Sequence, residues 1–317
     1  MNTAAVSIRT VFEETVKQIE LDPTRSERAS ERYSAVKRQI ESALPGKSVF
    51  QVGSFQRKTK IRPLDPNDPL DIDAAVCFGD CHQYAASGTG VFPSTALETV
   101  RSALVDNKTY RLMRPHSDAP TVVLEYADGF KIELIPCFRD LTGSYPRLGG
   151  PGCYIVGSAS GLWIPADYDY DANVIAGLNQ TPAVRKALVP SIKLIKAFLR
   201  EKGSALKSFH IEILCARILP GTIATWETKG LAWDYRHVLA HFLSEASGHL
   251  SAAVSLPGSY SPPESSGLGY LELFSEGYSL KQLGEQAWTI SKLGDTAEAD
   301  RQWRQLWSPP PLRFRSA

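Results

Sequence analysis

The stretch that decides the fold is GSFQRKTKIRP at residues 53–63, followed after a short loop by DID at residues 71–73. Asp71 opens an alternating run that becomes continuously apolar, which predicts a strand entering a buried core. Residues two apart on a strand share a face and lie about 6.5–7 Å apart. Asp71 and Asp73 are therefore expected to project their carboxylates side by side, while Ile72 faces the core.

A paired carboxylate motif of this kind indicates a bound cation. Two unpaired carboxylates about 4 Å apart repel by roughly 1 kcal/mol in water and by more when partly buried. Glu133 alternates with apolar neighbours on the second strand of a predicted hairpin with an Asp-Gly turn. If that strand lies beside the first, Asp71, Asp73 and Glu133 form one set. We expect these three to be the catalytic carboxylates and the ligands of two Mg²⁺ or Mn²⁺ ions, an arrangement for in-line phosphoryl transfer.

A second interpretation of the acidic residues stays open. In this interpretation the acidic residues form a solvated loop or part of a calcium loop. The glycine and terminal glutamate spacing of an EF-hand is missing, however. The residues upstream favour a nucleotide site instead. Gly53 permits close approach of the backbone to a phosphate, and Ser54 offers an N–H and a hydroxyl to anionic oxygens. Thr59 adds a donor, although the polarity of a turn also explains it.

The second half of the chain is predicted to be helical and supplies cationic and aromatic candidates. Lys193 and Lys196 lie opposite the apolar stripe of a helix over residues 184–202. Ser208 and Phe209 begin the next helix, whose N-terminus suits a phosphate while the ring suits a base. The alternatives are a solvated lysine face, an N-cap serine and a core phenylalanine.

Together these motifs resemble the signature of bacterial cGAS/DncV-like nucleotidyltransferases (CD-NTases). That family belongs to the polymerase-β-like superfamily and acts in cyclic-oligonucleotide antiphage signalling (CBASS). Glu133 resembles the family's third carboxylate, which is usually Asp. The likeness covers roughly residues 8–220 and is carried by the following residues: Gly53-Ser54-Phe55, Thr59, Ile61, Pro63, Asp71-Ile72-Asp73, Glu133-Leu134-Ile135-Pro136, Ile192 to Phe198, and Ser208 to Glu212.

The resemblance implies an α+β enzyme with two lobes and a central cleft. One lobe would be a polymerase-β-like nucleotidyltransferase with a small mixed sheet, and the other a C-terminal helical lobe. By the same match, Lys196 and Ser208 would bind the donor triphosphate and Phe209 would stack on a base. The enzyme would join nucleoside triphosphates, ATP or GTP among them, and release pyrophosphate. Its cyclic product would activate a separate effector, and a regulatory partner would control synthesis.

Composition and chain organisation fit this interpretation. The 317 residues carry a formal net charge of +1, which argues against a protein that coats long nucleic acid. No apolar stretch reaches the roughly 18 residues of a membrane helix, and the start lacks the layout of a secretory signal, so we expect a cytoplasmic protein. We expect a nucleotidyltransferase core with N-terminal helices over residues 1–170 and a helical lobe over residues 171–317. Residues 139–171 are predicted to form a long irregular connection.

Two other functions remain open from the sequence. The first is an enzyme that extends an RNA or makes linear oligonucleotides, as template-free polymerases of the superfamily do. The near-neutral charge disfavours a long RNA substrate. The second is a nucleotide-binding sensor without turnover. Keeping three unpaired acids together without a metal costs free energy, which argues against this alternative. The bases joined, the linkage, the ring size, the trigger and the oligomeric state are not encoded in these patterns.

Overall fold

The computed structural model describes residues 7–65, 68–81, 91–141, 154–250, 253–259, 261 and 268–307. The chain divides into two compact units, which we call the sheet unit and the helical unit. The sheet unit comprises Leu21–Val174 and Gly258–Pro262, and the helical unit comprises Met1–Glu20, Ile175–Pro257 and Pro263–Ala317. The first helix therefore groups with the helical unit, whereas the sequence analysis placed it with the nucleotidyltransferase core.

The sheet unit is built on a mixed sheet of seven strands in the order β1-β2-β5-β4-β3, with β6 on the far part of β5 and β7 on β6. β2 and β5 are parallel, and every other pair is antiparallel. The strands are β1 (Ser48–Gln51), β2 (Leu70–Asp80), β3 (His116–Asp118), β4 (Thr121–Glu125), β5 (Phe130–Arg139), β6 (Tyr154–Gly157) and β7 (Trp163–Ala166).

The prediction of an irregular connection over residues 139–171 is wrong in part, because β6, β7 and the start of α7 (Tyr168–Gln180) lie within it. Both strands have only four residues, and Gly and Pro nearby concealed their alternation. Residues 142–153 of that connection lie outside the described residues.

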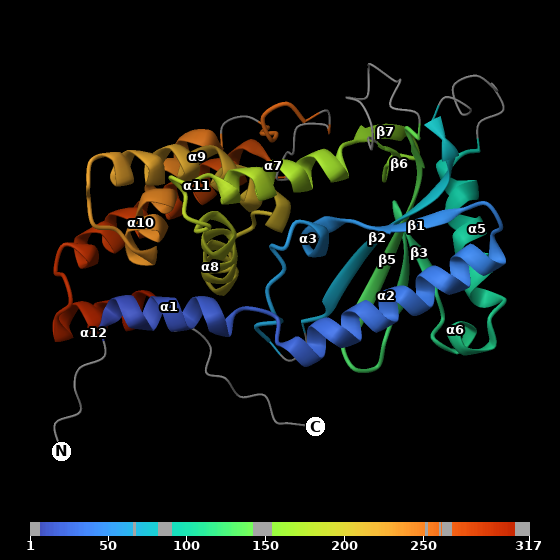
Figure 1. The fold of residues 1–317 in the computed structure, drawn as a ribbon, viewed down its shortest axis with the longest axis horizontal. Helices are drawn as coiled ribbons and strands as arrows, with labels where there is room; N and C mark the ends of the chain where they lie inside the picture. Colours follow the sequence, from blue (N-terminus) through green and yellow to red (C-terminus); the bar gives the residue numbers. More distant parts are fainter. Residues whose placement is uncertain are drawn as a thin grey trace. The chain divides into compact units, whose positions relative to one another are not determined.

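One face of the sheet is covered by α2 (Pro23–Ala43) and α5 (Pro93–Val105). Figure 1 shows α2 lying along the sheet. The Asp22 side chain caps α2 by accepting a hydrogen bond from the Arg25 N–H, and Pro23 is the first residue of the helix. Ile40 of α2 and Leu104 of α5 pack on the inward residues of the strands, which alternate as the sequence indicated. This core fixes which side chains of β2 and β5 point the other way.

The opposite face is only partly covered. Val52, Val156 and Ala166 form a smaller apolar cluster with residues towards the C-terminal ends of β2 and β5. The charged residues near the start of the two strands lie on this same face and are half-buried. The polar site is therefore built on the side of the sheet that the large core leaves uncovered.

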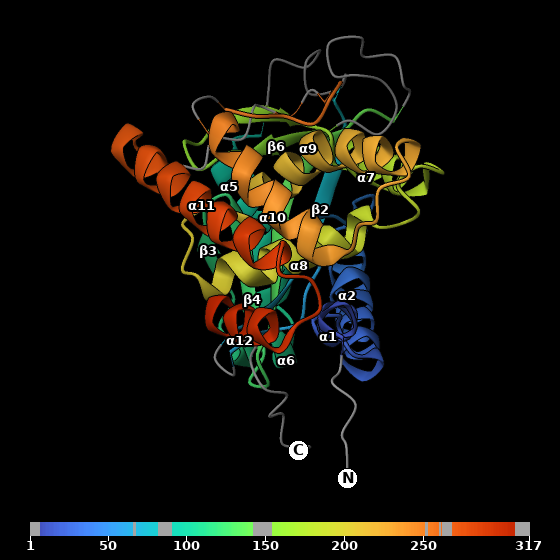
Figure 2. The same ribbon diagram turned by 90° about the vertical axis from the view of Figure 1, so that its left-hand side faces the viewer.

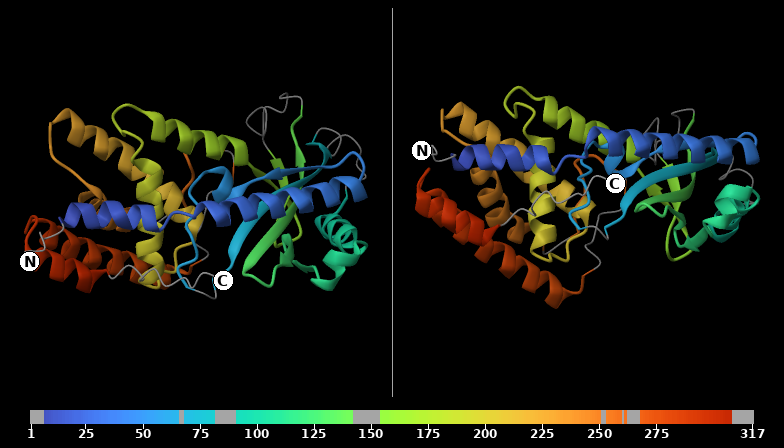
Figure 3. Two further views of the ribbon diagram at one scale, coloured as in Figure 1. Left: turned by 60° about the horizontal axis from the view of Figure 1, so that its bottom comes forward. Right: turned by 90° about the horizontal axis from the view of Figure 1, so that it is seen from below.

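The helical unit packs its helices around the apolar stripe predicted for the 184–202 region, and that stripe is buried. Figure 2 shows α10 beside α11, and Figure 3 gives two further views of the fold. The last part of the described chain forms two helices, separated by a turn with Gly294 at φ +65°. The helices are α1 (Ile8–Gln18), α8 (Leu188–Glu201), α9 (Ser208–Thr228), α10 (Tyr235–Ala246), the 3₁₀ turn η2 (Ser247–His249), α11 (Tyr270–Ser291) and α12 (Ala297–Leu306).

Among the residues that the structure describes, no helix has both the length and the apolar character needed to cross a membrane. Two short helices complete the sheet unit: α3 (Gly53–Gln56) and α6 (Lys108–Leu112).

The large core gives a stability prediction. Leu134 is fully buried beneath α2 and α5, so Leu134→Ala should lower the free energy of unfolding by about 2–5 kcal/mol through lost contacts and a residual cavity. Leu112→Ala is the matched control, because Leu112 is 82% exposed. Urea denaturation followed by circular dichroism measures both variants. Equal losses for the two would contradict the assignment of Leu134 to the core.

Candidate active site

The register of the parallel pair β2 and β5 places the acidic residues together. Asp73 lies opposite Glu133, and Asp71 lies opposite Lys131. Side chains of directly paired residues point to the same side of a sheet, so all four share the uncovered face. The sequence analysis made this juxtaposition conditional on the two strands being neighbours, and the structure shows that they are. The metal-binding role of the three acids stays a prediction.

Lys131 lies between the carboxylates. Its Nζ atom is 2.7 Å from Glu133 Oε1 and 3.2 Å from Asp71 Oδ1. Burial lowers the pKa of Lys131, but the hydrogen bond to Glu133 and the charges of Asp71 and Glu133 outweigh it, so the pKa lies above its ordinary value. The sequence analysis missed this residue. The alternation that identified Glu133 places Lys131 two residues earlier on the same face, but it does not show that acids flank Lys131 on both sides.

Asp73 is the acid whose charge is least favoured. Burial raises the pKa of Asp73, the charges of Glu133 and Asp71 raise it further, and Lys60 and Arg57 partly offset the rise. A carboxylate in that environment is stabilised in its charged form by a nearby cation. The shift therefore points to a site that accepts positive charge.

The residues fit a divalent ion in the chemistry of their donors but not in the arrangement seen with Lys131 between them. Carboxylate oxygens are the ligands that Mg²⁺ and Mn²⁺ prefer, and Asp73 and Glu133 occupy adjacent positions on neighbouring strands. Within the described part of the chain, however, no three His, Cys, Asp or Glu side chains converge on a point that would hold a metal. Metal binding would therefore require side chains to rotate and the Lys131 ammonium to move.

Gly53 lies directly against Asp73. The Val52 N–H donates to the Asp73 carbonyl oxygen over 3.0 Å, which ties the loop to β2. Gly53 then adopts φ +71° and begins α3, and a Cβ atom built there would lie 2.0 Å from Asp73 Oδ2. The position needs glycine for its backbone conformation and for space. Ser54 follows, half-buried, on the same short helix.

Thr59 closes this loop rather than lining its surface. Its side chain is fully buried, and its N–H donates to the Ser54 carbonyl oxygen over 2.9 Å. Lys60 follows, with its Nζ 3.9 Å from Asp71 Oδ2. The structure thus places Gly53 against Asp73, with Ser54 next in the chain, and the backbone hydrogen bond of Thr59 holds the loop in shape.

An ion-pair network that the sequence did not reveal holds α3, the helix that begins at Gly53, in place. The Asp169 carboxylate accepts hydrogen bonds from Gln56 Nε2 at 2.6 Å and from Arg139 Nη2 at 2.7 Å. These contacts join α3, the end of β5 and the start of α7. Close by on α7, burial raises the pKa of Asp171 to about 6, although Ser259 and Ser261 hydrogen-bond to its carboxylate. Gln56 and Arg139, the two partners of Asp169 named here, are far from it in sequence, so no local pattern predicts these contacts.

The other candidate nucleotide-binding residues lie in the helical unit. Lys196 is buried, and its Nζ is 3.0 Å from the fully buried Glu212 Oε1. Lys193 Nζ is 2.9 Å from Glu20 Oε1. Ser208 is exposed at the first position of α9, and the N-cap is Lys207, so Ser208 does not act as the cap.

Phe209, the next residue, is half-buried, so part of its ring is accessible. Exposure at the start of a helix of 21 residues suits Ser208 for an anion. The roles of these residues remain predictions.

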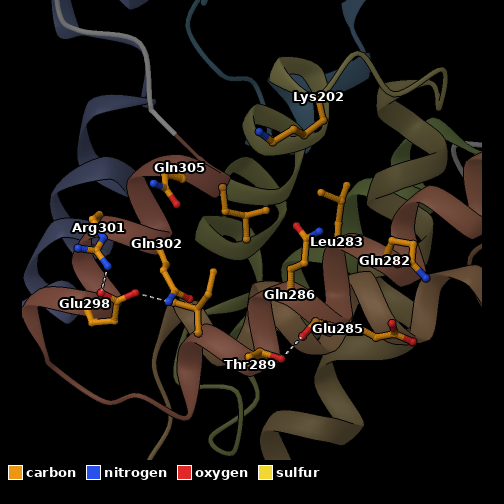
Figure 4. Close-up of a pocket in the computed structure, with 12 residues that line it drawn as sticks. Lys202, Gln282, Leu283, Glu285, Gln286, Thr289, Glu298, Arg301, Gln302 and Gln305 are labelled. Carbon is orange, nitrogen blue, oxygen red and sulfur yellow. Dashed lines mark hydrogen bonds and ion pairs between the residues drawn. The ribbon is translucent and has the colours of Figure 1, made fainter.

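A hollow of about 810 Å³ lies within the helical unit, between α11 and α12 (Figure 4). Its lining is mostly neutral or self-paired, because Glu298 hydrogen-bonds to Arg301 and Gln302. Thr289 likewise donates to the Glu285 carbonyl oxygen over 2.8 Å. The hollow brings no set of like charges together, in contrast to the acidic face of the sheet unit.

Comparison with known proteins gives the same fold. Residues 6–147 match the family described as the Second Messenger Oligonucleotide or Dinucleotide Synthetase domain (SMODS). The chain is similar to Bradyrhizobium diazoefficiens CD-NTase CdnG in complex with GTP, with a TM-score of 0.62 and 17% identity over 94% of this chain and 98% of that one. No curated protein matches by sequence.

Two further solved structures support the likeness. Vibrio cholerae DncV cyclic AMP-GMP synthase matches with a TM-score of 0.57 and 14% identity over 95% of this chain and 86% of that one. Rhodothermus marinus CdnE c-UMP-AMP synthase matches with a TM-score of 0.56 and 14% identity over 88% of this chain and 96% of that one.

The α+β fold that the sequence predicted is the fold shared with these solved nucleotide synthases. Residues 6–147 carry the SMODS domain match, and the chain has the fold of the solved CD-NTase structures to which it is similar.

The contact between Gly53 and Asp73 yields a test of the loop. Gly53→Ala places a methyl group where the Asp73 carboxylate lies, so nucleotide turnover should fall by roughly a hundredfold or more because reacting groups are displaced by about 1 Å. Gly129→Ala is the matched control, since Gly129 has φ +82° but open space around it. Pyrophosphate release measures turnover. An equal effect of both substitutions would show that backbone strain alone is responsible.

The buried Lys196–Glu212 pair predicts a loss of stability that would mask a binding role. Lys196→Met leaves the Glu212 charge uncompensated, so unfolding should become easier by about 3–5 kcal/mol, and adding Glu212→Leu should recover most of that loss. Lys193→Met is the control and should cost under about 1 kcal/mol, because its partner Glu20 is half-exposed. Urea denaturation measures all three variants.

Nucleotide affinity of the double variant then tests the triphosphate role. Failure of Glu212→Leu to restore stability would contradict the ion-pair account.

Proposed function

We propose that this chain is a cyclic dinucleotide or cyclic oligonucleotide synthase that uses nucleoside triphosphates and releases pyrophosphate at each bond. The observation that carries the proposal is the placement of Asp73 opposite Glu133 on parallel strands, with Asp71 two residues before Asp73 on the same face. Gly53 brings the phosphate-binding loop against that acidic face.

Each carboxylate has a role in this mechanism. Asp71, Asp73 and Glu133 would hold two Mg²⁺ or Mn²⁺ ions. Such ions, when bound, neutralise the triphosphate and the leaving pyrophosphate and lower the pKa of an attacking ribose hydroxyl. The protein's own part is to keep three anionic side chains on one rigid sheet, so that the acceptor and the donor meet in a fixed geometry.

The loop and the helical unit bind the nucleotides. Gly53 and Ser54 offer backbone and hydroxyl donors to the phosphates, and Thr59 holds that loop in shape. In the helical unit, Ser208 receives triphosphate oxygens at the start of α9. Phe209 stacks on a base.

Lys193 and Lys196 add positive charge in the helical unit. The Lys196 ammonium, which hydrogen-bonds to Glu212, would meet the donor triphosphate as a point charge. Lys193 meets a phosphate only after leaving its partly exposed partner Glu20.

The likeness to solved enzymes supports the proposed substrates, and the resemblance of the sequence motifs to the CD-NTases supports the proposed biological role. Structures similar to this chain are described as a CdnG with GTP and a cyclic AMP-GMP synthase, which supports ATP and GTP as substrates. The product is a second messenger for CBASS antiphage defence in the cytoplasm, where it activates a separate effector. A regulatory partner controls when synthesis starts.

The reaction product tests the proposal. Purified protein with the four nucleoside triphosphates and Mg²⁺ or Mn²⁺ should yield a product that resists phosphatase, with a cyclic mass by mass spectrometry. A product that phosphatase always degrades would indicate a linear oligonucleotide synthase, and extension of a labelled RNA would indicate an RNA nucleotidyltransferase. Nucleotide binding without pyrophosphate release would indicate a sensor. Each of these three outcomes contradicts cyclisation.

The carboxylates give a mutational prediction. Asp73→Asn should lower pyrophosphate release by about a thousandfold or more, since several kcal/mol of charge stabilisation in the transition state is lost. Asp118→Asn on β3 is the control, because Asp118 is an exposed carboxylate of the same sheet. Circular dichroism verifies that both variants fold. Full activity of Asp73→Asn would overturn the site assignment.

A further inference from the structure

We propose that Lys131 is an internal counter-cation of the catalytic carboxylates, that a divalent ion displaces it, and that Glu125 then receives its ammonium. This inference rests on the proposed function, because it takes Asp71 and Glu133 as metal ligands. It adds a residue that positions the metal site without taking part in the reaction itself.

The contacts of Lys131 carry the first step. Its Nζ atom lies 2.7 Å from Glu133 Oε1 and 3.2 Å from Asp71 Oδ1, so one ammonium bridges a carboxylate of β5 and one of β2. Lys60 is a further cation near these acids, and its Nζ is 3.9 Å from Asp71 Oδ2. The bridging position is the place where a cation shared by the two strands would bind.

An ammonium and a divalent ion compete for this position. Both need the same carboxylate oxygens, and two cations about 4 Å apart repel strongly where solvent is limited. Lys131 and Glu133 are only about one-quarter exposed, so screening by water is incomplete. Binding of the metal therefore requires the ammonium to leave the Asp71–Glu133 bridge.

Glu125 offers the displaced ammonium a second partner. It lies directly opposite Lys131 on β4, on the other side from Asp71, and it is exposed. Opposite residues of antiparallel strands have Cβ atoms about 4.5–5.5 Å apart. Rotation of the Lys131 side chain therefore carries its charge from the acids to Glu125 without moving the sheet.

The arrangement has a consequence for the free enzyme. Three carboxylates on one face would repel one another and weaken the pairing of β2 with β5. Lys131 offsets that repulsion until nucleotide and metal arrive. The same contact raises the metal concentration that the site needs, because the incoming ion must replace an existing partner.

Direct metal binding tests the inference without using activity. Mn²⁺ titrations monitored by electron paramagnetic resonance, in the presence of a non-hydrolysable ATP analogue, give the dissociation constant. Lys131→Met should bind Mn²⁺ about tenfold more tightly than the natural protein, because the competing charge is gone. Lys108→Met is the matched control, since Lys108 is exposed on α6 in the same unit, and it should leave the constant unchanged.

A second variant keeps Lys131 in place. Glu125→Gln removes the partner of the displaced ammonium, so Mn²⁺ binding should weaken roughly two- to threefold. Thermal unfolding adds an independent readout: Lys131→Met should unfold at a lower temperature than the natural protein without metal and should gain more from added Mg²⁺.

The outcomes separate the two proposals. Unchanged or weaker Mn²⁺ binding by Lys131→Met, with normal binding by the natural protein, would overturn the counter-cation role and leave the proposed function standing. Absence of Mn²⁺ binding by the natural protein, with the analogue present, would overturn both. Tighter binding by Lys131→Met together with weaker binding by Glu125→Gln would support the exchange of partners.

Discussion

The parallel pairing of β2 with β5 is the constraint on which the site depends. A shift of one residue in that register would turn every side chain of one strand to the other face. Asp73 would then no longer lie opposite Glu133, and an acid would enter the apolar core. Fully buried residues such as Ile72 and Ile132 prevent the shift, because they alternate with the acids and pack beneath α2 and α5. The same burial that stabilises the sheet therefore sets the positions of the charges.

Much of this could be predicted from the sequence because it depends on short-range periodicity. The alternation around Asp71 and Asp73 identified one strand, and the Asp-Gly turn identified the hairpin that carries Glu133. The pairing of the two strands was left as a condition, since periodicity does not reveal which strands are neighbours. Helical spacing identified Lys193 and Lys196, and the resemblance to a known family gave Lys196 its expected role. No local pattern discloses that Lys196 pairs with the buried Glu212.

The parts that escaped prediction share a physical cause. Asp169 joins residues distant in sequence, and strands of four residues such as β6 and β7 are too short for a clear alternation. Lys131 escaped for a different reason. A lysine on a half-buried strand face is usually a solvated side chain, and its significance emerges only when the acids on both sides of it are placed.

The presence of glutamate at position 133 is consistent with the contact that Glu133 makes with Lys131. The family resemblance leads one to expect aspartate at position 133, and glutamate extends the carboxylate by one methylene group. Residues two apart on a strand lie about 6.5–7 Å apart, and the longer side chain helps the Glu133 carboxylate to approach the Lys131 ammonium at 2.7 Å. An aspartate at position 133 would reach less far towards Lys131, so the Lys131 ammonium would interact more with Asp71 and less with residue 133. The extra reach therefore suits a site whose acids share a lysine before they share a metal ion.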